Sequence, residues 1–566
     1  MHKPLIDIRN VSFAYPGNET RVLDGANLQV FEGDFLAIVG GNGSGKSTLC
    51  KTMNGLIPRF YVGEFEGEVI TDGMDTSVHD VAALSQSIGY VYQDFENQLL
   101  RPTVKEDASF VPLNYGLPDF MERGEWALQV TGLAHLKNEF VWQLSGGQKH
   151  LLALAGAIAM RPKILIVDEP IAQLDPQHAI QIYDVLKILN EQYGTTIIVI
   201  EHHTEFIAKY CKQVVLMDHG RVFWKKAVRE ALCSVEDLME RQIYPPQVTQ
   251  AAHYLNLDHY PITLEEAVAC FEGRTLSEIH SPKTILKGST PKLSLKNTSV
   301  QYKTLGKKVK KALINISVDF LEGDQVALVG NNGAGKSTLL KLLTGIVKPT
   351  EGSLELLGKP LRKITPEELS SHIAYVFQNP EEMFIEDSVR KEIEYYLKVR
   401  KIENYGELVD RIMDDFDLTD FQHQDARLMS GGQQRRVSLA IGAAMRPSVI
   451  ILDEPTANLD IATKSKVVMM LEQLKKHVDT IIIATHDMQL VAEWANRMIV
   501  MHAGEVLMDD TTDAIFQQRE TLTQAGLVPP QIIALCNELN FPHCTTVEEF
   551  AKCWKGAAKR GELVGN

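Results

Sequence analysis

Two short glycine-rich stretches have the residue types and the spacing of a phosphate-binding loop. Residues 40–47 read GGNGSGKS and residues 330–337 read GNNGAGKS, so both fit the pattern G-x-x-x-x-G-K-[ST]. In such a loop, successive backbone N–H groups and the N-terminus of the following helix form a concave anion site. The residues expected around the phosphates are Gly40, Gly41, Asn42, Gly43, Ser44, Gly45, Lys46, Ser47 and Thr48, and in the second stretch Gly330, Asn331, Asn332, Gly333, Ala334, Gly335, Lys336, Ser337 and Thr338.

The lysine and serine near the end of each stretch supply a charge and an oxygen ligand. Lys46 and Lys336 would place a positive charge on the γ-phosphate. Ser47 and Ser337 would offer a hydroxyl to Mg²⁺, a hard cation that prefers oxygen. Two copies of the pattern leave little room for chance, so the sequence predicts two nucleotide sites.

After each loop comes an apolar run that ends in two acids and a proline. The runs are ILIVDEP at 164–170 and VIILDEP at 449–455. Such a run predicts a buried parallel strand, which would deliver both carboxylates to its C-terminal end beside the phosphate loop. Asp168 and Asp453 then suit the Mg²⁺ shell, and Glu169 and Glu454 suit the orientation of the attacking water. A lone DEP is more often only a strand end before a turn, but the paired loops favour the nucleotide site.

Between loop and acids, each half contains SGGQ before an alanine-rich helical run. The stretches are LSGGQ at 144–148 and MSGGQ at 429–433. The combination of phosphate loop, SGGQ and DEP resembles the ATP-binding-cassette (ABC) ATPases, whose signature is SGGQ, over almost the whole chain. The resemblance implies an ATPase that uses ATP and Mg²⁺. It also implies an α/β fold with two P-loop nucleotide-binding domains in tandem, each with a helical signature subdomain.

The resemblance assigns roles to an aromatic residue and a glutamine in each half. Tyr15 and Tyr302 stand where the family places an aromatic that stacks on adenine. A half-buried core tyrosine is the alternative, because aromatics routinely fill cores. Gln93 in YVYQD and Gln378 in YVFQN match the family's Q-loop glutamine, which touches Mg²⁺ and the attacking water and links the site to a membrane partner.

A histidine and an aspartate in each half complete the family pattern. His202 and His486 match the switch histidine that contacts the γ-phosphate, whereas a lone histidine after a strand is more often structural. The neighbouring His203 is expected to be only a surface residue. Asp175 in AQLD and Asp460 in ANLD match the loop that crosses between the two ATPase units.

In the family, two units pair head to tail, and the phosphate loop of one faces the SGGQ of the other. ATP on Lys46 would thus be closed by the second half and ATP on Lys336 by the first, within one chain. Because both halves keep every motif, two competent sites are expected, although Leu151 stands where the second half has Arg436. The closing residues would be Ser145, Gly146, Gly147 and Gln148, and Ser430, Gly431, Gly432 and Gln433.

Composition bounds the partners of the chain. A net charge of −16 and a pI of about 5.6 argue against a broad nucleic-acid-binding face, which needs clustered Lys and Arg. The seven cysteines form no CxxC pair, which predicts reduced thiols rather than disulfides or a metal site. The longest small-apolar run, residues 151–160, is too short to span a bilayer. Together with the resemblance to ABC ATPases of transporters, this implies a peripheral protein on the cytoplasmic face of the cell membrane.

Three uses of the ATPase compete: the motor of a membrane transporter, a translation ATPase and a DNA-repair ATPase. The acidic charge and the lack of an iron–sulfur cysteine segment or coiled-coil arm favour the transporter. The segments around the two Q-loop glutamines resemble those of energy-coupling-factor (ECF) importers, which take up vitamins, vitamin precursors or metal ions. Sugar importers with two cassettes are the alternative, but the motifs of their second half are typically degenerate. The resemblance implies two kinds of membrane partner, a transmembrane coupling protein and a substrate-binding subunit.

A further repeat follows each cassette. Residues 244–257 read YPPQVTQAAHYLNL and residues 528–541 read VPPQIIALCNELNF, with apolar residues at helical spacing. The repeat resembles the C-terminal extension of ECF ATPases, which helps to hold the two units together; a simple cap on each core is the alternative. The expected domains are 1–240 (cassette), 241–271 (helical extension), 272–291 (linker), 292–524 (cassette) and 525–566 (helical extension).

Overall fold

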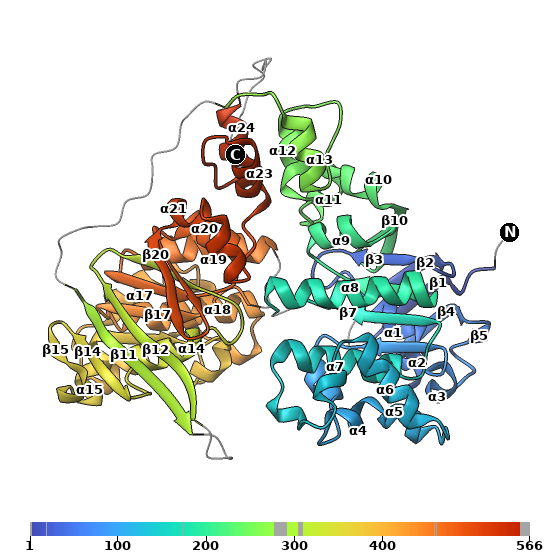
Figure 1. Ribbon diagram of the computed structural model, residues 1–566, viewed down its shortest axis with the longest axis horizontal. Coiled ribbons are helices and arrows are strands. Elements are labelled where there is room, and N and C mark those ends of the chain that lie inside the picture. The colour runs from blue at the N-terminus through green and yellow to red at the C-terminus, as the bar shows by residue number, and fades with distance from the viewer. Residues whose placement is uncertain are drawn as a thin grey trace. The chain divides into compact units, whose positions relative to one another are not determined.

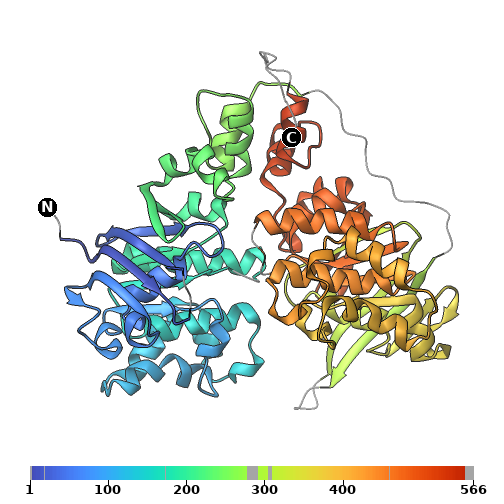
Figure 2. The ribbon, with the colours of Figure 1, turned by 180° about the vertical axis from the view of Figure 1, so that it is seen from behind.

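The computed structural model describes residues 3–17, 20–171, 174–276, 291–303, 309–457, 459 and 461–554. The chain forms two compact units, of which the first ends at Gly273 and the second begins at Arg274. Figure 1 colours the first unit blue to green and the second yellow-green to red, and Figure 2 shows both from behind. Most of the predicted linker (277–290) and the end of the last predicted domain (555–566) lie outside the described residues.

The first unit is built on two β-sheets. The smaller is antiparallel, with the strand order β2-β1-β4-β5. The larger has the order β10-β9-β3-β8-β7-β6 and is parallel except for the pair β9 and β10. The strands are β1 Ile6–Ala14, β2 Leu23–Val30, β3 Phe35–Val39, β4 Glu64–Thr71, β5 Met74–Asp75, β6 Ile88–Val91, β7 Ile164–Asp168, β8 Thr196–Ile200, β9 Gln213–Asp218 and β10 Arg221–Ala227.

The second unit repeats this topology strand for strand. Its sheets have the orders β12-β11-β14-β15 and β16-β17-β18-β13-β19-β20, so the predicted duplication is confirmed at the level of the fold. The strands are β11 Leu293–Lys303, β12 Val309–Phe320, β13 Gln325–Val329, β14 Glu351–Leu356, β15 Lys359–Pro360, β16 Ile373–Val376, β17 Val449–Asp453, β18 Thr480–Ala484, β19 Arg497–His502 and β20 Glu505–Thr511.

The larger sheet of each unit is buried on both faces. In β3, Phe35, Ala37 and Val39 belong to one hydrophobic core, and Leu36 and Ile38 belong to the other. Because neighbouring side chains of a strand point to opposite faces, a sheet covered on both sides requires an uninterrupted apolar run. This explains why the strands before the predicted acids read ILIV and VIIL.

Helices connect the strands of the first unit and form its signature subdomain, which lies between β6 and β7. They are α1 Lys46–Met53, α2 Leu56–Arg59, α3 Val81–Leu84, α4 Val104–Ala108, α5 Phe110–Asn114, α6 Phe120–Val130, α7 Gly146–Ile158, α8 Pro176–Tyr193, α9 Thr204–Tyr210, α10 Val228–Cys233, α11 Val235–Glu240, α12 Gln247–Tyr254 and α13 Leu264–Phe271, with 3-10 turns η1 Phe95–Gln98, η2 Ala134–Leu136 and η3 Val141–Gln143.

The second unit has a similar set of helices, without a counterpart of α2 among its described residues and with α16 in place of α4 and α5, and its signature subdomain lies between β16 and β17. They are α14 Lys336–Leu343, α15 Pro366–His372, α16 Val389–Val399, α17 Gly406–Asp415, α18 Gly431–Ala444, α19 Ile461–Leu474, α20 Met488–Trp494, α21 Thr512–Phe516, α22 Arg519–Gln524, α23 Gln531–Leu539 and α24 Val547–Cys553, with 3-10 turns η4 Leu361–Lys363, η5 Pro380–Met383, η6 Thr419–Phe421 and η7 Ala426–Leu428.

The repeated tails form the helices that their spacing predicts. Helix α12 buries Val248, Ala251 and Ala252, and α23 buries Ile532, Leu535 and Cys536, whereas Leu255 and Leu539 are half-buried. The stretches TLEE at 263–266 and TVEE at 546–549 fit the S/T-x-x-E pattern of a capping box, which predicts the start of another helix after each tail. These boxes are formed with a shift of one residue. Thr263 and Thr546 cap α13 and α24, but Glu266 and Glu549 accept from the backbone N–H of Ile262 and Thr545, the residues before the caps.

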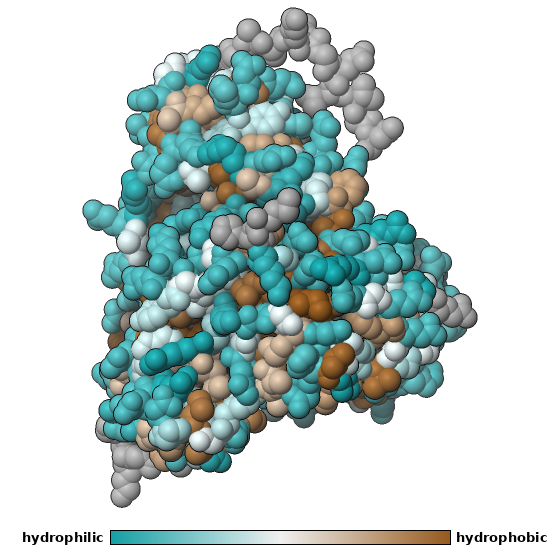
Figure 3. Space-filling view, turned by 90° about the vertical axis from the view of Figure 1, so that its right-hand side faces the viewer, coloured by the Kyte–Doolittle hydropathy of each residue, from teal (hydrophilic) through white to brown (hydrophobic). Residues whose placement is uncertain are grey.

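Among the described residues, no helix combines the length and the apolar character needed to cross a membrane. Figure 3 shows one face of the molecule, on which hydrophobic residues lie in separate spots among hydrophilic ones.

Candidate active site

Each phosphate loop joins the C-terminal end of a central strand to the N-terminus of a helix, β3 to α1 and β13 to α14. Lys46 Nζ donates hydrogen bonds of 2.8 and 3.0 Å to the carbonyl oxygens of Gly40 and Gly41. Lys336 Nζ donates a hydrogen bond of 2.6 Å to the carbonyl of Gly330. Each ammonium therefore lies over the loop in which phosphates are expected.

The first glycine of each loop is required by space. A Cβ atom on Gly40 would lie 2.5 Å from the carbonyl oxygen of Met217, and one on Gly330 would lie 2.3 Å from that of Met501, closer than real Cβ contacts. The Ser44 hydroxyl beside Gly40 is buried and makes no hydrogen bond to the described residues. A buried polar group of this kind calls for a partner, which a bound phosphate would supply.

The first acid of each DEP lies at the end of its strand. The Asp168 carboxylate accepts a hydrogen bond from the Ser47 hydroxyl and another from Tyr90 (3.3 Å). Asp453 accepts one from Tyr375 (2.8 Å). Burial raises the pKa of both carboxyls, which a nearby cation would counteract. The paired oxygens of Ser47 and Asp168 fit Mg²⁺.

The second acid of the first unit meets both other predicted catalytic residues. Glu169 Oε2 accepts a 2.8 Å hydrogen bond from Gln93 Nε2, and Glu169 Oε1 lies 3.4 Å from His202 Nε2. The Glu169 backbone has a φ of +50°, a left-handed conformation that few non-glycine residues adopt. The fold thus brings together three side chains from distant parts of the sequence.

The second unit arranges the same trio differently. Glu454 Oε2 lies 3.0 Å from His486 Nδ1, and Glu454 also has a positive φ of +45°. Among the described residues, however, Gln378 makes no hydrogen bond to Glu454. The two candidate sites are therefore similar in composition but unequal in geometry.

The two candidate adenine-stacking tyrosines also differ. Tyr15 is half-buried, lies edge-on to Phe13 with ring centroids 4.8 Å apart, and has its hydroxyl 3.4 Å from Thr48 Oγ1 in the phosphate loop. Tyr302 is 40% exposed near the end of β11. The structure places Tyr15 beside the loop and leaves Tyr302 open to solvent.

SGGQ forms the first turn of a helix in each unit. Ser145 N donates to Gln148 Oε1 (2.9 Å) and Ser430 N to Gln433 Oε1 (3.0 Å), which closes the N-terminus of α7 and α18. Both serines and the glycines that follow them, Gly146 and Gly431, are exposed, whereas Gly147 is buried and Gly432 half-buried. Backbone N–H groups at such a helix start suit an anion.

The aspartate expected in the crossing loop has a local structural use. Asp175 caps α8 and accepts hydrogen bonds from His178 N (3.0 Å) and Nδ1 (2.8 Å). A Cβ on Gly147 would lie 2.3 Å from the His178 ring, so the signature turn packs directly on this cap. Asp460, its counterpart, lies outside the described residues.

The sequence prediction missed a buried acid next to the switch histidine. Glu201 is 2% exposed and accepts hydrogen bonds from Tyr183 Oη (2.8 Å) and from the backbone of His202 (2.8 Å). His203, expected to be only a surface residue, has its Nδ1 2.8 Å from Glu201. Burial raises the pKa of Glu201, but the hydrogen bonds from His203 and Tyr183 lower it by more. The sequence signal for this network was that Glu201, a charged residue, directly follows the apolar strand β8.

A second missed residue is His150 on α7. Its ring is 1% exposed, stacks on Phe95 with centroids 4.2 Å apart, and makes no hydrogen bond to the described residues. Burial lowers the pKa of His150 from 6.5 to about 4. The neutral ring is therefore the stable form in the folded unit.

This burial predicts a pH dependence of stability. Because the folded pKa lies below the unfolded value, the unfolded state binds the extra proton between pH 6.5 and about 4. The stability of the first unit should fall as pH decreases through this window, by up to about 3 kcal/mol. H150F, which keeps the stack on Phe95, should flatten this dependence in scanning calorimetry.

The matched control for that prediction is H259Q, since His259 is an exposed residue of the first unit. It should leave the pH dependence of unfolding unchanged. An equally steep dependence in H150F and in the unmodified chain would contradict the buried neutral histidine.

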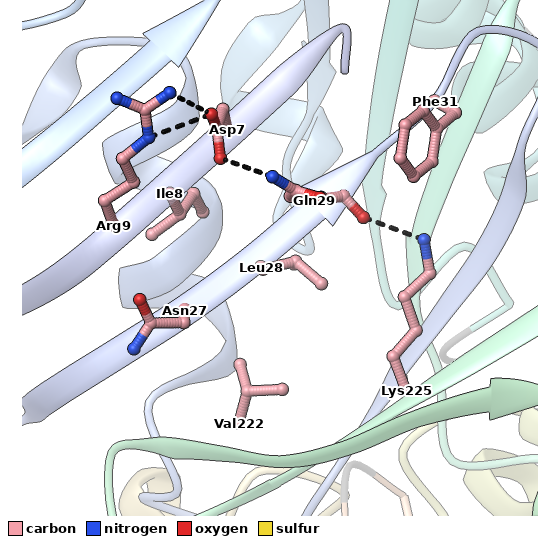
Figure 4. A pocket seen from close by; sticks show the side chains of 9 residues that line it. All are labelled: Asp7, Ile8, Arg9, Asn27, Leu28, Gln29, Phe31, Val222 and Lys225. Carbon is pink, nitrogen blue, oxygen red and sulfur yellow. Dashed lines mark hydrogen bonds and ion pairs between the residues drawn. The ribbon is translucent and has the colours of Figure 1, made fainter. Parts of the chain in front are cut away.

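A surface groove of the first unit holds none of the predicted site residues (Figure 4). Its polar side chains are already paired: Arg9 and Gln29 donate to Asp7, and Lys225 donates to the carbonyl of Gln29. The groove is therefore separate from the candidate active site.

Comparisons with known proteins point to one family. The ABC transporter family pattern matches residues 23–172 and 313–457. A protein of Caldanaerobacter subterraneus subsp. tengcongensis named as an ABC transporter ATP-binding protein is 34% identical over 97% of this chain and 99% of its own. One of Methanosarcina mazei with the same description is 33% identical over 96% of each chain. The solved structure of cbiO1 from Clostridium perfringens, described as part of the ABC transporter complex cbiONQ, is 32% identical over 45% of this chain and 100% of its own, with a TM-score of 0.39.

The chain belongs to the ABC transporter family. It is a tandem ATPase with two ATP-binding cassettes, and the expected fold class and ATP-hydrolysing activity are confirmed.

Proposed function

We propose that the chain is the ATPase subunit of an ECF-type importer that takes up a vitamin, a vitamin precursor or a metal ion. It would act at the cytoplasmic face of the membrane with two separate kinds of integral membrane subunit, a coupling protein and a substrate-binding protein. The family membership supports the transporter, and a surface feature found beside both Q-loops supports a docked partner.

Each active site would use the trio described above. Lys46 and Lys336 bind the γ-phosphate, Glu169 and Glu454 orient the attacking water, and the switch histidines hold the glutamates in place. Mg²⁺, held by the hydroxyl, aspartate and glutamine of each unit, would neutralise phosphate charge. The proposed Mg²⁺ ligands are Ser47, Gln93 and Asp168, and Ser337, Gln378 and Asp453.

Both Q-loops present an exposed apolar side chain on a rigid turn. The backbone N–H groups of Leu100 and Arg101 donate to Asp107 Oδ1 at 2.8 and 2.9 Å. In the second unit, the equivalent N–H groups of Ile385 and Glu386 donate to Glu392 Oε1 at 2.7 and 2.8 Å. Asp107 and Glu392 are 6% and 3% exposed. In each unit, a buried acid thus fixes the equivalent turn.

The side chains that these turns present are open to solvent. Leu100 is 63% exposed and Ile385 is 64% exposed. Presenting an apolar group on an immobilised turn lowers the entropy cost of binding, which suits a hydrophobic partner surface. Since each turn follows the Q-loop glutamine, a membrane subunit docked there would sense the nucleotide site.

The repeated extensions, α12 with α13 and α23 with α24, are consistent with the ECF type. In this proposal they help to hold the two cassettes together during the cycle, because the same pair of helices is repeated after each cassette and carries none of the predicted site residues.

The test is purification of the chain from its native membrane with bound partners. The unmodified chain should recover integral membrane proteins, and L100E with I385E should lose them while keeping ATP hydrolysis. V78E is the control, since Val78 is 68% exposed but lies away from the Q-loop in sequence. Recovery of ribosomes instead of membrane proteins would overturn the proposal.

A further inference from the structure

The two units hold their Q-loops to the signature helix by different contacts. In the second unit, Arg435 on α18 is 2% exposed and lies two residues after SGGQ. Its Nη1 donates to the carbonyl of Phe377 at 2.9 Å, and its Nη2 donates to the carbonyl of Gln378 at 2.6 Å. One guanidinium group therefore holds two successive carbonyls of the backbone, that of Phe377 and that of the Q-loop glutamine itself.

The first unit has His150 at the equivalent position. Its ring stacks on Phe95 of the Q-loop segment, with the two rings 15° from parallel, and makes no hydrogen bond to the described residues. Two charge-assisted hydrogen bonds are directional, whereas a stack between rings tolerates sliding. The segment just before Gln93 is held instead by Gln98, whose side chain accepts a hydrogen bond from Tyr92 N and donates one to the Tyr90 carbonyl, both 3.0 Å. Among the described residues, no side chain of α7 donates to the carbonyl of Tyr92 or Gln93.

The neighbouring position serves as an internal reference because both units use it alike. Lys149 Nζ lies 2.9 Å from Glu96 Oε1, and Gln434 Nε2 lies 3.2 Å from Glu381 Oε1. Both signature helices therefore contact the turn after the Q-loop, whereas among the described residues a hydrogen bond from the signature helix to the Q-loop backbone is present in the second unit alone. This difference accompanies the unequal sites, because Gln93 reaches its glutamate and Gln378 does not.

We propose that Arg435 is a positioning residue that ties Gln378 to the signature helix, so that the two ATP sites differ in how they hold Mg²⁺. The inference rests on the proposed role of the Q-loop glutamines as Mg²⁺ ligands. In the second unit, the signature helix and the Q-loop move as one body. In the first unit, where α7 makes no such hydrogen bond to the described Q-loop residues, Gln93 moves independently of the signature helix between Glu169 and the cation.

The experiment isolates each site with a lysine substitution and titrates Mg²⁺. In K46A only the second loop binds ATP, and there R435H should raise the Mg²⁺ concentration for half-maximal ATP hydrolysis about tenfold, the effect of losing a charge-assisted hydrogen bond. R435K, which keeps the buried cation, should recover part of this loss. In K336A, where only the first loop binds ATP, R435H should change nothing.

The comparison separates this role from a general disturbance of α18. In the head-to-tail pairing expected of the family, a damaged α18 would impair the site on the first loop, so an effect in K336A instead of K46A overturns the proposal. The control is R436L, because Arg436 on the same turn pairs with Asp417 instead of the Q-loop. An equal effect of R436L would also overturn it.

Two further outcomes are distinguishable. If K46A abolishes hydrolysis, the Mg²⁺ dependence of ATP binding, measured by equilibrium dialysis, gives the same comparison. If the unmodified chain binds ATP without any Mg²⁺ dependence, the proposed Mg²⁺ ligands fail together with this inference. If Mg²⁺ dependence is normal and R435H leaves it unchanged in K46A, the role of Arg435 alone fails.

Discussion

Replacing Glu169 and Glu454 together with glutamine is expected to reduce ATP turnover by at least about a hundredfold while ATP binding persists. A positioned carboxylate contributes on the order of 10²–10⁴ to proton transfer from an attacking nucleophile, and an amide of the same shape cannot accept that proton. The strained backbone at both glutamates holds the carboxylates at the strand ends and should be unchanged by glutamine.

The single variants test whether both sites work. E169Q and E454Q should each keep part of the turnover, measured as phosphate release at saturating ATP. E191Q is the control, since Glu191 is an exposed residue of α8. If one single variant stays near the unmodified rate and the other loses all activity, only one site hydrolyses ATP.

A glutamate at Gly431 is expected to remove turnover at the site on the first phosphate loop, by at least about tenfold. A Cβ on Gly431 has no described atom within 4 Å, and this exposed glycine starts helix α18. An acidic side chain at that position suits the helix dipole, so the unit should not be destabilised. Loss of activity would therefore come from the negative charge that the glutamate adds where a γ-phosphate is expected to bind.

The site affected identifies the pairing. With head-to-tail pairing, G431E should abolish turnover in the E454Q background, where only the first loop is active, and spare it in E169Q. G146E should do the reverse. G406E is the matched control, because Gly406 is an exposed glycine at the start of α17 with the same free space. Loss of turnover in the same unit as the substitution would contradict the pairing.

Much of the architecture could be predicted from sequence because its signals are local. A phosphate loop is one contiguous turn between a strand and a helix, so its glycines, lysine and serine are specified within eight positions. The apolar runs before the acids identify strands buried on both faces, and the spacing of the tails identifies their helices. The capping boxes were displaced by one residue because several neighbouring N–H groups compete for the same glutamate.

The contacts between distant segments could not be read in this way. Tyr90 binds Asp168 and Tyr375 binds Asp453 across neighbouring parallel strands, a pairing that depends on strand order. In the sequence, Asp107 and Glu392 are ordinary acidic residues of predicted helices. Only the structure shows that each accepts hydrogen bonds from the backbone of the turn after the Q-loop. A periodic pattern predicts which face of a helix is buried, but it does not predict how far each residue is buried. Burial lowers the pKa of His150 and so keeps its ring neutral.

The sequence by itself determined that this is a duplicated ABC ATPase and which residue types each candidate site contains, because those motifs are short and contiguous. Only the tertiary structure decided which of these residues touch one another. Gln93 reaches Glu169 from 76 positions away, whereas Gln378 is anchored through its backbone by Arg435, which is 57 positions away. The physical reason is that such contacts are set by how helices and strands pack. Nearly identical motifs therefore end in two candidate sites of unequal geometry.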